Sequence, residues 1–286
     1  MDFLYTALTE NNIPYPPCVN FDGFTRWGKN KRYWLFPVGE GYIFGDWSQN
    51  TRAFAFPKNA KTVTSQQLQE IKEKIHTEQQ HFKNAQKIEQ IHISDNVTKR
   101  TPSLFDAPKA HEYLKKKHIL PLSAKYDAPT DNLVIPLYDT NGKIWSWQTI
   151  SSNGKKYFLN GGRTKGCFHP IGDLTPTIIV CEGFATAATI YQATGLYTIA
   201  AMNAGNIEPV VDAISKKYPS ANIIIAADND WEKEVNVGKE SAKSAAKQHR
   251  LKVILPPNIR GVSDFNDIHV RYGIDTVKNQ LQGVLS

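Results

Sequence analysis

Between residue 177 and about residue 273, apolar runs of strand length alternate with segments of helical composition. The apolar runs are TIIVCEG, LYTIAAM, NIIIAAD and KVILP. Continuous Ile and Val runs that are separated by helices are typical of parallel strands covered by helices on both faces. This alternation therefore predicts an α/β domain with a mainly parallel sheet and helices on both faces.

Acidic residues follow two of these predicted strands. Glu182 lies at the end of the first run, and Asp228 and Asp230 follow the third run, two positions apart. Open α/β sheets place their sites at the carboxyl ends of the strands, and Mg²⁺ binds oxygen ligands, usually carboxylates together with water and phosphate. Several carboxylates in one place repel one another unless a cation neutralises them. We therefore predict a Mg²⁺ or Mn²⁺ site at Glu182, Asp228 and Asp230, in preference to three unrelated helix caps.

Two further acidic residues lie in SDFND, after the last predicted strand. Asp264 and Asp267 can complete the metal site, or they can cap the helix that follows, because Asp is a favoured N-cap residue. The sequence does not decide between these two roles. Gly183, directly after Glu182, allows the backbone to approach a ligand closely.

The segment before the alternating region is basic and mixed in pattern. Residues 107–118 predict a short helix whose final lysines suit the negative end of a helix dipole, and SDNVTKRTPS before it predicts a loop. Asn141-Gly142 predicts a hairpin, because both central positions of such a turn need a positive φ. In the loop GKKYFLNGGRTKG, the glycines leave backbone N–H groups free to bind phosphate. The alternative for this loop is a solvated segment with no ligand.

Residues 1–60 are rich in aromatic residues and glycine. Short runs on either side of Gly39 predict antiparallel hairpins, and residues 64–92 predict a long helix with one buried stripe. The aromatic residues can stack on bases beside basic side chains that neutralise phosphates, or they can form the hydrophobic side of a small sheet. In the first alternative, the candidate residues for binding single-stranded DNA are Arg26, Trp27, Lys31, Arg32, Trp34 and Trp47.

Composition bears on partners and compartment. The chain has 286 residues and a formal net charge of +7, which fits a nucleic-acid partner but also many other proteins. Cys18, Cys167 and Cys181 form no CxxC pair, so we expect no zinc site. Neither a secretory leader nor an apolar run of membrane-spanning length is visible, so we expect a cytoplasmic protein with no membrane partner.

Three motifs in fixed order resemble a known family. CEGFATAATI, followed by IIIAADND and SDFND, resembles the Toprim fold shared by DnaG-type primases, topoisomerases and OLD-family nucleases. EGFATA is similar to the EGYATG or EGYATA motif of primases encoded by phages, satellite phages and conjugative plasmids. Upstream, IPLYDTNGKIWSWQTI and KKYFLNGGRTKGCFHPIG resemble the segment before Toprim in DnaG-type catalytic cores. The resemblance covers about residues 107–273.

This resemblance implies a fold and a division of the chain. The fold is a Rossmann-like Toprim sheet, preceded by a small α+β subdomain of primase type and by an aromatic-rich N-terminal β region. The expected parts are an N-terminal region, a helical linker, a basic α+β subdomain and a Toprim catalytic domain, at residues 1–60, 61–100, 101–175 and 176–286.

The resemblance also implies roles for single residues. Glu182 matches the Toprim glutamate, a metal ligand or general acid/base, and Asp228 and Asp230 match the metal-binding aspartates. Asp264 and Asp267 match a less constant trailing acidic motif. The residues implied to bind nucleotide or template are Lys156, Asn160, Arg163, Lys165, Gly183, Asn203 and Gly205.

The implied function is synthesis of short RNA primers from ribonucleoside triphosphates on a single-stranded DNA template, for a phage, plasmid or other mobile genetic element. The chain lacks a GxxxxGK[ST] loop, so a helicase partner is expected as a separate protein. Two alternatives stay open at this point. One is a Toprim nuclease that acts on DNA, and the other is a replication adaptor that binds single-stranded DNA without catalysis.

Overall fold

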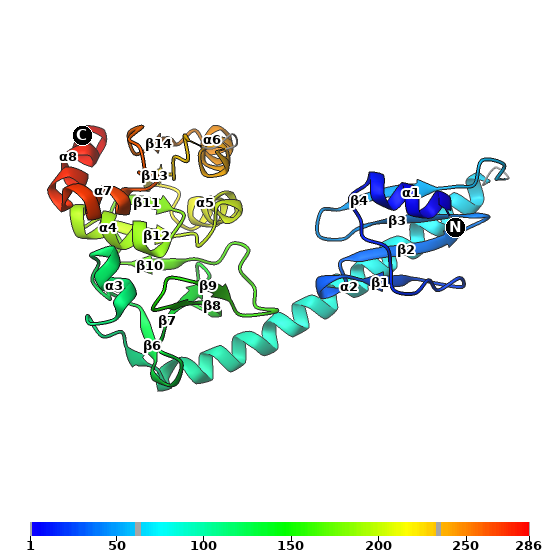
Figure 1. Ribbon diagram of the computed structural model, residues 1–286, viewed down its shortest axis with the longest axis horizontal. Helices are drawn as coiled ribbons and strands as arrows, with labels where there is room; N and C mark the ends of the chain where they lie inside the picture. The colour runs from blue at the N-terminus through cyan, green and yellow to red at the C-terminus, as the bar shows by residue number, and fades with distance from the viewer. Residues whose placement is uncertain (1, 61–63, 233–235, 286) are drawn as a thin grey trace. The chain divides into compact units, whose positions relative to one another are not determined.

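The computed structural model describes residues 2–60, 64–232 and 236–285. The chain divides into two compact units, Met1–Ile88 and Glu89–Ser286, both shown in Figure 1. Helix α2 (Ser65–Arg100) begins in the first unit and ends in the second. The fourfold division given above stays a prediction, and residues 61–63 at its first boundary lie outside the described residues.

The first unit contains a four-stranded antiparallel sheet in the order β1-β2-β3-β4. Its strands are β1 (Thr25–Trp27), β2 (Tyr33–Val38), β3 (Gly41–Asp46) and β4 (Thr51–Ala55). The predicted hairpin around Gly39 is confirmed, because β2 pairs with β3 on either side of it. Gly39 has a φ of +56°, a conformation that glycine adopts without steric strain.

Helices cover both faces of this sheet. On one face, α1 (Asp2–Glu10) packs Leu4 into a core with Leu35 and Phe44. On the other face, α2 packs Ile75 against Trp34. Successive side chains of a strand point to opposite faces, so Trp34 and Leu35 enter different cores. The aromatic residues of this region therefore supply much of its hydrophobic interior.

Helix α2 is longer than the sequence predicts. The segment from Ser94, expected to be a loop, is helical as far as Arg100. Ser94 Oγ donates a hydrogen bond to the Ile144 carbonyl at 2.5 Å, and Val97 is buried beside Trp147. These contacts with the second unit's own sheet stabilise a helical end that local polarity alone disfavours.

The second unit begins with a five-stranded antiparallel sheet in the order β5-β6-β7-β8-β9. Its elements are β5 (Phe105–Asp106), α3 (Glu112–Lys117), β6 (Lys125–Asp127), β7 (Asn132–Tyr138), β8 (Ile144–Ser151) and β9 (Lys156–Phe158). The predicted helix over 107–118 is correct only in its second half. Pro108 disfavours helical geometry at Ala107, and the helix starts after its N-cap residue, His111.

The predicted hairpin around Asn141-Gly142 forms, but its turn differs from the expected one. β7 pairs with β8 up to the contact of Tyr138 with Ile144, so the connection has more than two residues. Gly142 has a φ of +78°, whereas Asn141 is not in the positive-φ region. Asp139 Oδ1 accepts hydrogen bonds from the backbone N–H groups of Asn141 and Lys143, and this side-chain contact stabilises the longer turn.

The second sheet of this unit has the order β10-β12-β11-β13-β14 and is parallel except for its edge strand β10. Its strands are β10 (His169–Ile171), β11 (Thr177–Cys181), β12 (Tyr197–Ala200), β13 (Asn222–Ala226) and β14 (Lys252–Ile254). Its helices are α4 (Phe184–Thr194), α5 (Ile207–Lys217), α6 (Val237–His249), α7 (Phe265–Tyr272) and α8 (Ile274–Leu285). The predicted strand–helix alternation is confirmed.

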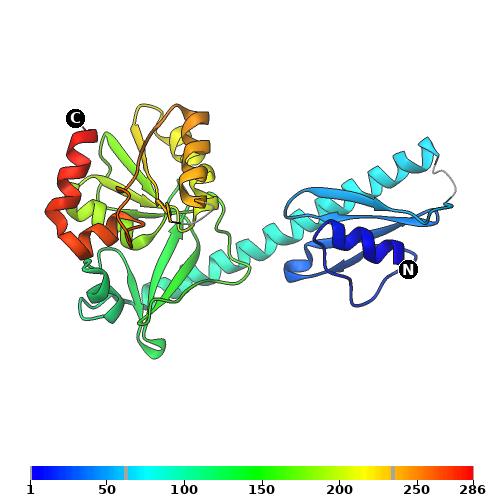
Figure 2. The ribbon, with the colours of Figure 1, turned by 45° about the horizontal axis from the view of Figure 1, so that its top comes forward.

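Helices lie on both faces of the parallel sheet, as Figures 1 and 2 show. Ile179 and Ile224 point into a core shared with α4, α7 and α8. Ile178 and Ile223 point into a core shared with α5 and α6. A sheet buried on both faces explains why its strands read as continuous apolar runs. The predicted α/β fold class is confirmed.

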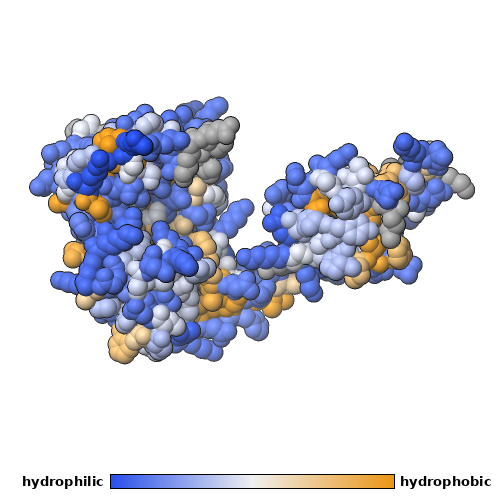
Figure 3. All heavy atoms as spheres, viewed as in Figure 1, coloured by the Kyte–Doolittle hydropathy of each residue, from blue (hydrophilic) through white to orange (hydrophobic). Residues whose placement is uncertain are grey.

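On the face of the molecule shown in Figure 3, hydrophilic residues predominate and hydrophobic ones form small patches. Among the described residues, no helix is both long enough and apolar enough to cross a membrane.

Candidate functional site

The carboxyl ends of β11 and β13 meet at one edge of the parallel sheet. Cys181 pairs with Ala226 in the register of the two strands. Glu182 directly follows β11 and Asp228 follows β13 by two residues, so both extend from this edge. The Met202 N–H donates to the Glu182 carbonyl at 2.6 Å, which fixes the backbone beside the first carboxylate. The sequence prediction that strand ends bring Glu182 and Asp228 together agrees with this geometry.

The loop after β13 is joined to the loop before α7. The Asn229 N–H donates to the Ser263 carbonyl at 2.7 Å. The buried Asn229 side chain donates to the Pro256 carbonyl at 3.0 Å and to Asn258 Oδ1 at 2.8 Å. These bonds hold the two acidic motifs DND and SDFND next to each other.

Four acidic side chains at this edge form what we call the carboxylate cluster: Glu182, Asp228, Asp230 and Asp264. Burial, followed by the charges of Asp264 and Glu182, raises the pKa of Asp228 to about 8. Burial also raises the pKa of Glu182, and the charge of Lys156 opposes that shift. The pKa of Asp264 is raised by burial and by the neighbouring Asp267. The cluster thus holds more negative charge than its surroundings compensate.

The donor set of the cluster fits a divalent cation such as Mg²⁺ or Mn²⁺. Carboxylate oxygens are the ligands that these hard cations prefer, and Asp228 Oδ1 is buried without a hydrogen-bond partner. Across residues 2–60, 64–232 and 236–285, no three Asp, Glu, His or Cys side chains already have the spacing of a metal cage. Mg²⁺ commonly binds through one or two carboxylates, with water and substrate phosphates as its other ligands. The cluster therefore suits a metal ion that binds together with a phosphate.

Asp264 and Asp267 both serve as helix caps. Asp264 is the N-cap of α7, and its Oδ1 accepts the Asp267 N–H at 2.7 Å in a capping box. Asp267 Oδ2 accepts the Ser263 N–H and hydroxyl, both at 3.0 Å. Of the two roles that the sequence left open, capping is therefore shown for both residues. Asp264 also raises the pKa of Asp228, so the two side chains lie close together. The role of Asp264 as a metal ligand stays a prediction.

Two lysines face the carboxylate cluster from the antiparallel-sheet side. Lys156 starts β9, and its Nζ lies 4.0 Å from the point where a Cβ on Gly183 would be. Desolvation, followed by the charge of the nearby Lys117, lowers the pKa of Lys156, and the charges of the cluster oppose this shift. Lys117 ends α3, its Nζ lies 3.7 Å from Asp267 Oδ1, and its charge acts to lower the pKa of Asp264 in the cluster. The site therefore combines carboxylates from one sheet with cations from the segment before it.

Sequence reasoning missed Lys117. The run Lys115–Lys117 fits the C-terminal turn of α3, and that explanation needs no ligand. The contact with Asp267 joins segments far apart in the chain, so no local spacing reveals it. The only available signal was that this run lies inside the block that resembles primase cores.

Two glycines and one turn border the cluster. A Cβ on Gly238 in α6 would lie 3.2 Å from Asp228 Cβ and 3.5 Å from Glu182 Oε2, so the start of α6 packs closely on the site, which the sequence did not predict. The backbone of Ala204 acts to lower the pKa of Glu182, against the larger effect of burial. Its neighbours Asn203 and Gly205 lie in the same turn, and their role in binding nucleotide or template stays a prediction.

The basic loop, residues 159–168, is held by contacts within the loop and by contacts with Trp145 and Asn206. The Arg163 guanidinium lies over the Trp145 ring at 4.5 Å, and its Nε donates to the Lys165 carbonyl at 3.2 Å. The Gly162 and Gly166 N–H groups donate to Leu159 O and Asn206 Oδ1. These two groups are therefore not free for phosphate, which corrects the expectation for Gly162 and Gly166. The roles of Asn160, Arg163 and Lys165 stay predictions.

The proposed DNA-binding residues of the first unit are largely engaged inside it. Trp27 is 8% exposed and Trp34 is 1% exposed, so neither ring has a free face for a base. Trp47 stacks on Trp34 with ring centroids 4.5 Å apart. Because the Trp27 and Trp34 rings are buried, they form the hydrophobic side of a small sheet, which is the second alternative given above.

The arginines of that set are paired, and one lysine remains exposed. Arg26 Nη1 donates to Glu78 Oε1 at 2.7 Å, and Arg32 Nε donates to Asp46 Oδ2 at 2.9 Å. Lys31 is exposed. Binding of DNA by these two arginines would first have to break an ion pair.

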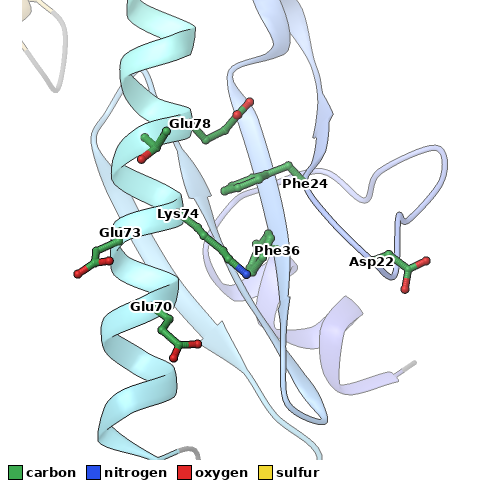
Figure 4. A pocket seen from close by; sticks show the side chains of 8 residues that line it. Asp22, Phe24, Phe36, Glu70, Glu73, Lys74 and Glu78 are labelled. Carbon is green, nitrogen blue, oxygen red and sulfur yellow. The ribbon is translucent and has the colours of Figure 1, made fainter.

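A groove on the α2 face of this sheet is also unfavourable for a phosphate backbone. Figure 4 shows its aromatic wall, Phe24 and Phe36, beside α2. The groove has a volume of about 660 Å³. Its charged lining residues are mostly acidic: Asp22, Glu70, Glu73, Glu78 and Lys74. Since a nucleic-acid backbone is attracted by cations, the acidic lining of this groove disfavours DNA there.

We expect Trp34→Ala to destabilise the first unit rather than to weaken DNA binding selectively. Removing a fully buried tryptophan costs about 3–5 kcal/mol through lost burial and a cavity. Thermal unfolding followed by tryptophan fluorescence measures this loss, and the exposed Phe54→Ala is the control. A variant with unchanged stability but much weaker binding of single-stranded DNA would restore the stacking interpretation.

The C-terminal part of the chain matches a known domain family. Residues 177–275 match the family model described as the Toprim domain. This range begins with β11 and includes every member of the carboxylate cluster.

Curated relatives match a larger part of the chain. The chain is 34% identical over 173 residues to a protein named DNA primase TraC from Escherichia coli, covering 57% of this chain and 16% of that protein. It is 38% identical over 131 residues to a second protein of the same name from Escherichia coli, covering 43% of this chain and 9% of that protein. The chain therefore matches less than a fifth of the length of these relatives.

Solved structures with a similar arrangement include two primase fragments. The structure of the DnaG catalytic core aligns with a TM-score of 0.47 and 13% identity, covering 68% of this chain and 79% of that one. The primase fragment of the bacteriophage T7 primase-helicase protein aligns with a TM-score of 0.42 and 17% identity, covering 62% and 73%.

Proposed function

We propose that this chain, whose residues 177–275 form a Toprim domain, synthesises short RNA primers on single-stranded DNA. One observation carries the proposal. Two lysines from the segment before the Toprim domain face the carboxylate cluster of that domain: Lys156 lies beside Gly183, and Lys117 contacts Asp267 and acts on the charge of Asp264. Cations opposite metal-binding carboxylates suit the transfer of a nucleotide, in which a metal ion and lysines share the charge of the phosphates. The sequence similarity to DNA primase TraC supports the same activity.

In this proposal, Glu182, Asp228 and Asp230 hold Mg²⁺ or Mn²⁺. When bound, the ion would stabilise the negative charge of the nucleotide phosphates and help to activate the primer 3′-hydroxyl. Lys156 and Lys117 neutralise the negative charge that develops on the reacting phosphates. A Cβ on Gly238 would lie 3.2 Å from Asp228 Cβ, so glycine at this position keeps a side chain from crowding the cluster.

We also propose the template and nucleotide roles of the basic loop. Arg163 and Lys165 carry positive charge on the segment directly before the Toprim domain, where Gly166 is fixed to Asn206 at 2.8 Å. Ribonucleoside triphosphates are the proposed substrates and single-stranded DNA the proposed template. We further propose that a separate replicative helicase is a partner and that the template belongs to a mobile genetic element.

A priming assay tests the proposed function. The purified chain is incubated with single-stranded DNA of mixed sequence, all four ribonucleotides, one of them labelled, and Mg²⁺ or Mn²⁺. Short, alkali-labile products that require both DNA and metal are the expected result. A folded protein that makes no such product with either metal, on templates of varied sequence, would contradict the proposal.

The same preparation distinguishes a nuclease. Supercoiled plasmid and the same metals are supplied without nucleotides. Nicking that depends on Asp228, in a protein that never extends a primer, would favour the nuclease alternative over the primase.

A further inference from the structure

A buried asparagine joins the two segments that carry the opposite charges of the site. Asn266 lies in α7, between Asp264 and Asp267, and is 0% exposed. Its Nδ2 donates to the Lys117 carbonyl at 2.7 Å and to Thr189 Oγ1 in α4 at 2.9 Å. One side-chain amide therefore connects α3, α4 and α7.

The Lys117 carbonyl is a natural place for such a bond. Carbonyls in the last turn of a helix have no partner inside the helix, and α3 ends at Lys117. On the next turn of α7, His269 Nε2 contacts the His118 carbonyl at 2.8 Å. These two contacts fix the end of α3 against the helix whose N-cap belongs to the carboxylate cluster.

If Asn266 served only to connect the helices, its burial would cost the folded protein stability. Asn266 Oδ1 is buried without a hydrogen-bond partner, and burying an unpaired acceptor costs stability. An apolar residue at this position would avoid that cost but would leave the Lys117 carbonyl unpaired. What the amide adds is a fixed position for Lys117, whose Nζ lies 3.7 Å from Asp267.

We propose that Asn266 is a positioning residue that holds Lys117 at the carboxylate cluster. The inference rests on the proposed function, because it assigns Asn266 to the reaction through Lys117. Asn206 makes a comparable joint elsewhere in this unit. It is 4% exposed, and it contacts Gly166 and Cys167 of the basic loop at 2.8 Å each. Asn206 does not contact Lys117 in any bond of the described residues, so it provides an internal comparison.

A double-mutant cycle on primer synthesis tests the coupling. We expect Lys117→Ala to lower kcat/KM about 100-fold and Asn266→Leu to lower it about 10- to 30-fold. Because Asn266 acts through Lys117, the double variant is expected to lose about 100-fold, not the product of the two losses. For Asn206→Leu with Lys117→Ala, the losses are expected to multiply. Multiplying losses for Asn266 with Lys117 would overturn the proposal.

Stability and local order provide a readout that does not depend on activity. Thr189→Val removes the other partner of the Asn266 amide but keeps the bond to Lys117, so it is the matched control for stability and is expected to keep activity within about threefold. We expect Asn266→Leu, but not Thr189→Val, to speed hydrogen exchange of α3 amides at least about tenfold. If hydrogen exchange of α3 is unchanged in Asn266→Leu, Asn266 does not fix α3, whether or not the wild type makes primers. If the exchange pattern is as expected but the wild type makes no primers, only the proposed function is contradicted.

Discussion

Asp228→Asn is expected to reduce primer synthesis about 10³-fold and to raise the melting temperature of the metal-free protein. The amide keeps the shape of the carboxyl group but removes a charge that the metal site requires. In the absence of metal, the same charge is a liability, because Asp228 is crowded by Asp264 and Glu182 and poorly solvated. Relief of such a strained site commonly yields about 0.5–2 kcal/mol, which corresponds to a rise of several degrees in the melting temperature.

The gain in stability from Asp228→Asn should depend on pH. The pKa of Asp228 is raised to about 8 in the folded protein, against about 3.9 in an unfolded chain. An acid whose pKa is raised on folding favours the folded state at low pH, and this contribution is lost as pH rises from about 4 to about 8. Asparagine behaves like the neutral acid. The difference in melting temperature between Asp228→Asn and wild type should therefore be small near pH 4 and largest near pH 8.

Calorimetry measures the melting temperature in EDTA and again with about 5–10 mM Mg²⁺ or Mn²⁺, a concentration chosen to saturate the site. Metal is expected to stabilise the wild type but not Asp228→Asn. Asp173→Asn, at an exposed acid before β11, is the matched control and should change neither activity nor the response to metal. Substantial priming by Asp228→Asn would remove Asp228 from the metal site, and an unchanged melting temperature in EDTA would refute the crowding of the cluster.

The sequence predicts the position of a site residue correctly where a single strand determines that position. Glu182 and Asp228 follow apolar runs, and parallel strands bring their carboxyl ends to the same edge. Their proximity therefore follows from the fold class alone. The helix cap at Asp264 is also a local pattern, because a capping box needs only residues three positions apart.

The parts that the sequence could not predict depend on contacts between distant segments. Lys117 reaches the site because α3 packs on α7, and Asn266 forms that joint from the interior of a helix. Nothing in the local spacing of either residue distinguishes it from a solvated lysine or a helical asparagine. Gly238 is similar, because its role follows from how closely α6 approaches Asp228.

For the N-terminal region, the sequence left two interpretations open. Trp27 and Trp34 belong to an aromatic and basic segment, a composition shared by DNA-binding surfaces and by small hydrophobic cores. Only burial distinguishes these two, and burial depends on α1 and α2, which pack on either side of the sheet. Composition alone could not decide the matter.

Lys156→Ala is expected to lower primer synthesis at least about 100-fold without weakening metal binding. Lys156 contributes a cation at the place where nucleotide phosphates would meet the carboxylate cluster, and loss of one such stabilising group costs about 10²–10³ in rate. The same cation repels a bound metal ion. Its removal should therefore leave the affinity for Mn²⁺ unchanged or increase it by up to about tenfold.

This combination separates a phosphate-binding residue from a metal ligand, because Asp228→Asn should lose both activity and metal affinity. Titration of Mn²⁺ by calorimetry or by electron paramagnetic resonance gives the affinity, and the priming assay gives the rate. Lys155→Ala removes the neighbouring exposed lysine, which is not among the groups that act on the cluster, and should stay within about threefold of the wild type in both measurements, since surface charges contribute little. If Lys156→Ala instead lost metal affinity in parallel with activity, Lys156 would be organising the carboxylates themselves, and the cations of the upstream segment would no longer be evidence for a phosphate at this site.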